Sequence, residues 1–217
     1  MQVYVNNIVE FISLLVSIWY YPHLKGSFMK WWLPFLGFIF LGELFEEYQW
    51  GVLRLPTIDI NYLIGIVESI FYSYFFYKLT HSNTLKKLIF FCLGLSILGY
   101  LVSFILFRKE YAYFFGNIIM SGFFLALIAL TYLYIKFVDD EENLLISEPG
   151  FWIALGVCLF YSGVSISFSL HGVIKKNNLT LFGESLLNIV PRILSVILYL
   201  SISISIILCK PKKKIFS

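Results

Sequence analysis

Residues 88–107 read LIFFCLGLSILGYLVSFILF, a stretch that contains no charged side chain. A helix that crosses a bilayer needs about 20 consecutive, mostly apolar residues. Comparable stretches fill the chain almost from end to end, at about 3–21, 31–50, 58–79, 86–107, 111–137, 149–171 and 185–209. The sequence therefore predicts one domain, residues 1–217, folded as an all-α integral membrane bundle of about seven transmembrane helices.

The overall composition agrees with a chain that has almost no water-soluble part. Hydrophobic residues make up 59% of the 217 residues and charged residues 13%, with a mean hydropathy of +0.84. Soluble domains carry about 25% charged residues. The first stretch is the weakest, because Asn6, Asn7 and Glu10 lie in its first half. Helices are expected throughout, since the alternating pattern of membrane barrel strands is absent.

Basic residues in the short loops predict the orientation, because cytoplasmic loops carry an excess of Lys and Arg. The loops on one side, together with the C-terminal tail, hold Lys25, Lys30, Lys78, Lys86, Lys87, Lys136, Lys210, Lys212, Lys213 and Lys214. The opposite loops hold only Arg54, Arg108, Lys109, Lys175 and Lys176. This asymmetry predicts that the N-terminus lies outside and the C-terminus in the cytoplasm.

A few ionisable residues interrupt the apolar stretches. Glu43 lies near the outer end of the second stretch, Glu68 near the middle of the third, and Arg192 in the seventh. A charge at the bilayer centre costs at least about 2.5 kcal/mol, so such residues normally face the bundle interior and pair. We predict that Arg192 pairs with Glu68, Glu43 or both. The alternative is a purely structural ion pair that fixes helix register.

Further polar residues and two prolines belong to the same prediction. Asn117 and Asn188 are expected to line the cavity of this polar cluster, with Glu46, Glu47 and Glu184 as secondary candidates. Proline removes a helical hydrogen bond and bends the helix. Helix kinks are therefore predicted at Pro34 and Pro191.

Catalytic and metal-binding patterns are missing from the sequence. The histidines, His23, His81 and His171, fall in loops or at the ends of stretches, and none lies at ligand spacing from another. The cysteines, Cys92, Cys158 and Cys209, lie in apolar runs, where a thiol is usually a packing residue. We therefore expect no disulfide, metal site or cofactor, and no enzymatic activity.

Two segments resemble a known family. One is Trp31-Trp32-Leu33-Pro34-Phe35 leading to Gly42-Glu43-Leu44, and the other is Pro149-Gly150-Phe151-Trp152-Ile153-Ala154-Leu155-Gly156 continuing to Phe160-Tyr161-Ser162-Gly163. Together they resemble small multi-span bacterial membrane proteins, one branch of which is the accessory membrane protein of type VI-B CRISPR loci. The resemblance implies the bacterial inner (cytoplasmic) membrane and a role in RNA-guided antiviral defence, and it carries over no catalytic residues.

These observations favour a non-enzymatic channel or pore-like component, with membrane lipid and further copies of the chain as partners. A second hypothesis is a transporter of a small molecule, an ion or protons that uses the same Glu and Arg cluster. A third is a sensor or adaptor that presents the acidic loop Asp139–Glu142 and the basic tail Lys210–Lys214 to a cytoplasmic protein. No direct binding of nucleic acid is expected, because the basic residues are divided among short loops.

Overall fold

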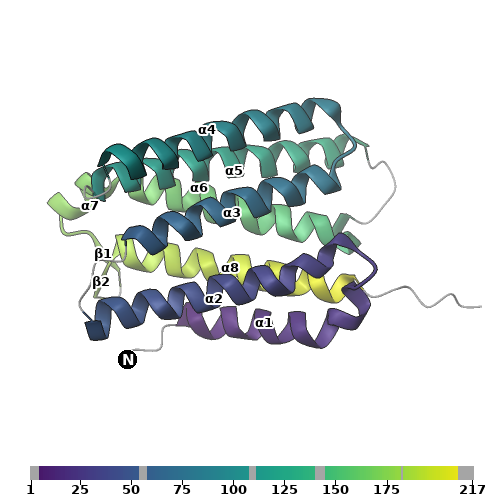
Figure 1. The fold of residues 1–217 in the computed structure, drawn as a ribbon, viewed down its shortest axis with the longest axis horizontal. Coiled ribbons are helices and arrows are strands. Elements are labelled where there is room, and N and C mark those ends of the chain that lie inside the picture. Colours follow the sequence, from purple (N-terminus) through teal and green to yellow (C-terminus); the bar gives the residue numbers. More distant parts are fainter. Residues whose placement is uncertain (1–4, 54–57, 108–110, 140–144, 182, 210–217) are drawn as a thin grey trace, which may run out of the picture.

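The computed structural model describes residues 5–53, 58–107, 111–139, 145–181 and 183–209. Within these residues seven long helices lie side by side in one bundle (Figure 1). They are α1 (Val5–Leu24), α2 (Trp32–Tyr48), α3 (Ile58–Leu79), α4 (Asn83–Phe107), α5 (Tyr111–Asp139), α6 (Pro149–Ser169) and α8 (Leu186–Leu208). Each of the predicted apolar stretches thus contains a helix, which confirms the all-α class.

Short elements connect the long helices. They are the 3₁₀ turns η1 (Phe28–Trp31) and η3 (Leu145–Ser147), the π-helical turn η2 (Gln49–Leu53), the helix α7 (His171–Lys176), and the strands β1 (Thr180–Leu181) and β2 (Glu184–Ser185). The two strands pair antiparallel, with Thr180 opposite Ser185. The sequence pattern did not predict this hairpin, which lies just before α8.

Five helices of the described residues are long and apolar enough to cross a membrane: Phe28–Leu53, which contains α2, and Asn83–Leu106, Phe115–Val138, Pro149–Ser169 and Leu186–Leu208. The helices α1 and α3 fall outside this group. The polar residues Asn6, Asn7 and Glu10 on α1, and Asp59 and Glu68 on α3, lower the mean hydropathy of these two helices.

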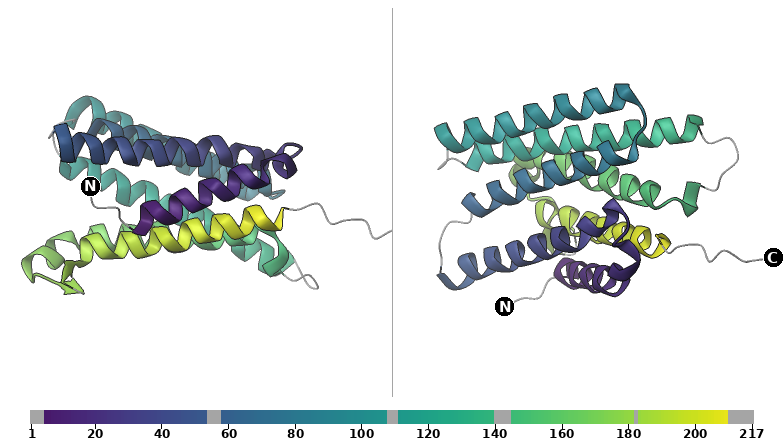
Figure 2. Two further views of the ribbon diagram at one scale, coloured as in Figure 1. Left: turned by 90° about the horizontal axis from the view of Figure 1, so that it is seen from below. Right: turned by 45° about the vertical axis from the view of Figure 1, so that its right-hand side comes forward.

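The helix α6 lies at the centre of the packing, against α5 on one side and α8 on the other. Gly156 allows this close approach, because a Cβ atom added there would lie 2.8 Å from the Cβ of Ser201 on α8. The helix α1 packs on α8 and also contacts α2, and it lies between these two helices in the left view of Figure 2 and at the lower edge of the bundle in the right view. The interior therefore lies where α2, α3, α5, α6 and α8 face one another.

The two ends of the bundle differ in charge. The links α1–α2 and α3–α4 and the C-terminal end of α8 lie at one end, which also carries Lys25, Lys30, Lys78 and Lys86 (Figure 1). The opposite end carries α7 and the β1–β2 hairpin. We call the first the basic end and the second the hairpin end.

Candidate functional site: a carboxyl cluster beside a cavity

Three glutamates from three different helices approach one another inside the bundle. They are Glu10 on α1, Glu43 on α2 and Glu68 on α3. The Glu10 carboxyl lies within hydrogen-bonding reach of Glu43, and Glu68 interacts electrostatically with both. The Glu10 side chain is fully buried. We call these residues the carboxyl cluster.

Polar contacts with α8 hold one side of the cluster in place. The Tyr199 hydroxyl donates a hydrogen bond to Oε1 of Glu10 over 2.5 Å. Close by, the Ser13 hydroxyl lies 2.9 Å from both the carbonyl oxygen of Tyr199 and the hydroxyl of Ser203. These bonds satisfy buried polar atoms of α1, which explains how a helix with several polar residues packs into an apolar bundle.

Other polar atoms at the cluster have no partner among the described residues. Oε2 of Glu10 is buried without a hydrogen bond. So is the hydroxyl of Tyr161, which lies beside the Glu68 carboxyl. None of the three carboxyl groups forms an ion pair with a lysine, arginine or histidine of the described residues. Because an unpaired charge is costly in a low-dielectric interior, such a cluster favours the binding of a proton or another cation.

The cluster borders a partly open cavity of about 960 Å³. Its lining comes from α2, α3, α4, α5, α6 and α8, and includes Glu43, Glu46, Asn61, Glu68, Tyr100, Phe115, Phe160, Tyr161, Phe168, Asn188 and Pro191. Glu43 and Glu68 keep part of their surface accessible because they face this cavity. The cavity therefore combines carboxyl groups with several aromatic rings.

The structure brings three of the five residues of the predicted polar cluster to this cavity. Glu43, Glu68 and Asn188 line it, together with the secondary candidate Glu46, which accepts a hydrogen bond from Asn61 over 3.0 Å. Glu47 instead faces α1 and accepts a hydrogen bond of 2.8 Å from Asn7.

Asn117 lies nearby without lining the cavity. It is buried on α5, and its side chain interacts with that of Tyr62 on α3. Its Nδ2 has no hydrogen-bond partner among the described residues. Asn117 therefore belongs to the packing behind the cavity wall.

The prediction that Arg192 pairs with Glu68 or Glu43 is wrong. In the described residues Arg192 forms an ion pair with Glu184, and the two side chains are 29% and 51% exposed. Glu184 lies in β2, immediately before α8, so its carboxylate reaches a guanidinium two turns into that helix. A local pair near the exposed hairpin end avoids the desolvation that pairing with Glu43 or Glu68 would require.

The two prolines have different roles. Pro34 is the third residue of α2, directly after the 3₁₀ turn η1, and the kink expected there stays a prediction. Pro191 lies inside α8, which continues to Leu208, and it lines the cavity.

Glu10 and Tyr199 were missed in the sequence analysis. Glu10, Ser13 and Ser17 are three and four residues apart, a spacing that places them on one helical face. All three are fully buried. That polar stripe was the available signal, and it identifies the side of α1 that faces inward.

No group of three or more His, Cys, Asp or Glu in the described part of the chain is placed to hold a metal ion. Cys92, Cys158 and Cys209 are free thiols.

No family model matches the chain, and no curated protein or solved structure is similar enough to it to count as a match. The link to RNA-guided antiviral defence therefore stays a prediction from the sequence. The acidic loop predicted to bind a partner falls mostly outside the described residues, and the basic tail falls wholly outside them.

Proposed function

We propose that the chain crosses a bacterial cytoplasmic membrane seven times, with its N-terminus outside. The five long apolar helices support this placement, and α1 and α3 run beside them with Glu10 and Glu68 facing inward. The outer surface is apolar: the exposed fractions of Phe90, Ile105 and Tyr134 are 63%, 74% and 68%. The lysines of the basic end support a cytoplasmic location for that end.

Within this bundle the carboxyl cluster binds a small cation, and the protein transports that cation across the membrane. The single observation that carries this function is the absence, among the described residues, of any ion pair to Glu10, Glu43 or Glu68 beside a cavity of about 960 Å³. Intramembrane carboxyl groups that face a cavity typically mark ion pathways and proton relays. A proton and a cation would compete for the same oxygens, which couples their movements.

The lining of the cavity favours an organic cation as the solute. Phe115, Phe160 and Phe168 line it together with Tyr100 and Tyr161. Aromatic faces attract cations by about 0.5–2 kcal/mol each. The volume falls within the range of about 300–1,000 Å³ that small-molecule sites occupy. The carboxyl cluster would then supply the negative charge that attracts the cation, and the aromatic rings would supply the surface that contacts it.

Transport in proteoliposomes tests this function. The probes are N-methyl-4-phenylpyridinium, a permanently charged aromatic cation, and protons followed with a dye inside the vesicles. We expect that uptake of the cation by the wild type is accompanied by proton release. Glu43→Gln and Glu68→Gln should each abolish both signals, whereas Glu184→Gln, at the exposed hairpin end, removes one carboxylate outside the cluster and should leave them unchanged.

Two results would contradict the transport function. One is equal flux of both probes in vesicles with and without the wild-type protein. The other is full activity of the Glu43→Gln and Glu68→Gln variants. Size-exclusion profiles of each variant, compared with that of the wild type, separate loss of function from loss of fold.

A channel is the second candidate, because the cavity reaches Asn188, an exposed residue near the hairpin end. Such a path gives ions access to the carboxyl cluster from that side. Conductance across a planar bilayer distinguishes the two mechanisms. Stepwise currents of inorganic ions that change in Glu68→Gln would support a channel, and their absence alongside organic-cation uptake would support a carrier.

A further inference from the structure

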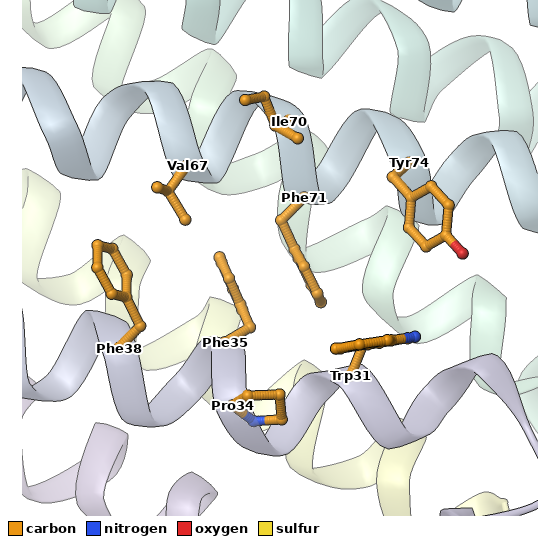
Figure 3. Close-up of a pocket in the computed structure, with 8 residues that line it drawn as sticks. All are labelled: Trp31, Pro34, Phe35, Phe38, Val67, Ile70, Phe71 and Tyr74. Atoms are coloured by element: carbon orange, nitrogen blue, oxygen red, sulfur yellow. The ribbon is translucent and has the colours of Figure 1, made fainter.

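A second hollow lies on the outside of the bundle, between α2 and α3. Its volume is about 340 Å³, and it is lined by Trp31, Pro34, Phe35, Phe38, Val67, Ile70, Phe71 and Tyr74 (Figure 3). We call it the α2–α3 groove. Within its lining the rings of Phe35 and Phe71 stack with their centres 3.7 Å apart.

The two ends of this groove differ. Trp31 and Tyr74 lie at one end, and Phe38 and Val67 lie at the other (Figure 3). Aromatic residues with a polar atom collect at the boundary between lipid tails and headgroups. The end with Trp31 and Tyr74 also lies toward the basic end of the bundle, since Trp31 directly precedes α2 and Tyr74 is in the last turns of α3.

Two lysines form cation–π contacts with these two aromatic rings. Nζ of Lys30 lies 5.6 Å from the centre of the Trp31 ring, and Nζ of Lys78 lies 5.4 Å from that of Tyr74. Both lysines are exposed, and neither forms an ion pair with an acidic residue of the described part of the chain. The groove thus has an apolar body and two free positive charges at one end.

The length of the groove fits one leaflet of a bilayer. From Trp31 to Phe38 a helix rises by about 10 Å, and half of the hydrocarbon core is about 15 Å thick. A chain lying along the groove would therefore start at the headgroup level and remain within a single leaflet.

We propose that the α2–α3 groove binds an acyl chain of an anionic phospholipid, with the phosphate of that lipid held by Lys30 and Lys78. The charge of the two lysines favours this occupant over a helix of a second copy, which would fill the apolar body and leave both ammonium groups without a partner. The inference depends on the membrane placement proposed above, but not on solute transport.

Quenching of tryptophan fluorescence by brominated lipids tests the proposal. The protein is placed in phosphatidylcholine vesicles that contain a small fraction of either brominated phosphatidylglycerol or brominated phosphatidylcholine. The contribution of Trp31 is the difference between the wild type and Trp31→Phe. Two lysines near the surface should favour the anionic lipid on the order of tenfold, so brominated phosphatidylglycerol should quench Trp31 at much lower concentration.

A matched pair of variants removes the same charge in two places. Lys30→Gln with Lys78→Gln should abolish the preference for phosphatidylglycerol. Lys86→Gln with Lys87→Gln, which lie at the start of α4, should retain it. Equal quenching of Trp31 by the two lipids in the wild type, or equal effects of the two double variants, would overturn the proposal.

Trp19 separates failure of the site from failure of the membrane placement. It is 81% exposed on α1 and lies outside the groove. In an inserted protein both brominated lipids should quench Trp19 to the same extent. Quenching of Trp19 without any at Trp31 would show that something other than lipid fills the groove. Quenching of neither residue would overturn both the groove and the membrane placement.

Discussion

The carboxyl groups of the bundle interior differ in their partners from two carboxyl groups at its ends. At the hairpin end Glu184 is paired with Arg192, and at the basic end Glu148 is paired with Lys136 over 2.8 Å. In the interior Glu10, Glu43 and Glu68 face one another, and no described lysine, arginine or histidine pairs with them. The partly exposed carboxylates of Glu148 and Glu184 thus have basic partners, whereas the three interior carboxyl groups have none among the described residues.

This difference separates a structural from a functional arrangement. If the buried carboxyl groups served only stability, a nearby base or an apolar replacement would lower the free energy of the fold. The interior instead keeps three acids beside a cavity, with an unpartnered carboxyl oxygen on Glu10. Under the proposed function, a bound cation supplies the positive charge that this cluster lacks.

The largest effect is expected when a permanent basic side chain is placed among the interior carboxyl groups. Tyr161 lies beside Glu68, so Tyr161→Lys would place an ammonium group at the carboxyl cluster. We expect uptake of the organic cation to fall by about 30-fold or more, since filling a buried charged site with a permanent partner removes an interaction of at least about 2 kcal/mol. Proteoliposome uptake measures this effect.

The control for this change is Tyr161→Met, which brings a side chain of similar length without the charge. It should retain more uptake than the lysine variant. Equal uptake by the two variants, at equal yield of folded protein, would mean that no cation binds next to Glu68.

The sequence predicted the helices because a long apolar run has few structural alternatives in a membrane. The bounds of α3, residues 58–79, agree at both ends. Glu43, Glu68 and Asn188 could be assigned to one cavity because acidic and amide groups in apolar stretches face the interior.

The pairing of charges could not be predicted in the same way. Counting residues gives the depth of a side chain but not its direction around the helix axis. Arg192 and Glu184 are linked by a turn from β2 into α8 that no apolar pattern encodes. Glu10 was overlooked because its partner Tyr199 is 189 positions away in the sequence.

Two buried tyrosines next to the carboxyl cluster are expected to contribute differently to stability. Tyr199 donates a hydrogen bond to Glu10, whereas the Tyr161 hydroxyl has no partner among the described residues. Tyr199→Phe leaves a buried acceptor unsatisfied and should lower the free energy of unfolding by about 1–3 kcal/mol. Tyr161→Phe removes only a looser contact with the Glu68 carboxyl and should change stability less than Tyr199→Phe does. Unfolding of both variants in mixed detergent micelles measures the difference, and equal losses would contradict the role of the Tyr199 bond.

The smallest effect is expected at the hairpin end. The Glu184–Arg192 pair is partly exposed, so Arg192→Gln should change the free energy of unfolding by about 0–1 kcal/mol. Exchanging both charges, Glu184→Arg with Arg192→Glu, should restore whatever a single change loses, whereas Glu68→Arg with Arg192→Glu should restore nothing. The same unfolding measurement decides between the two partners. Recovery by the second exchange would mean that the interior does hold its own base, and the contrast between interior and ends would be lost.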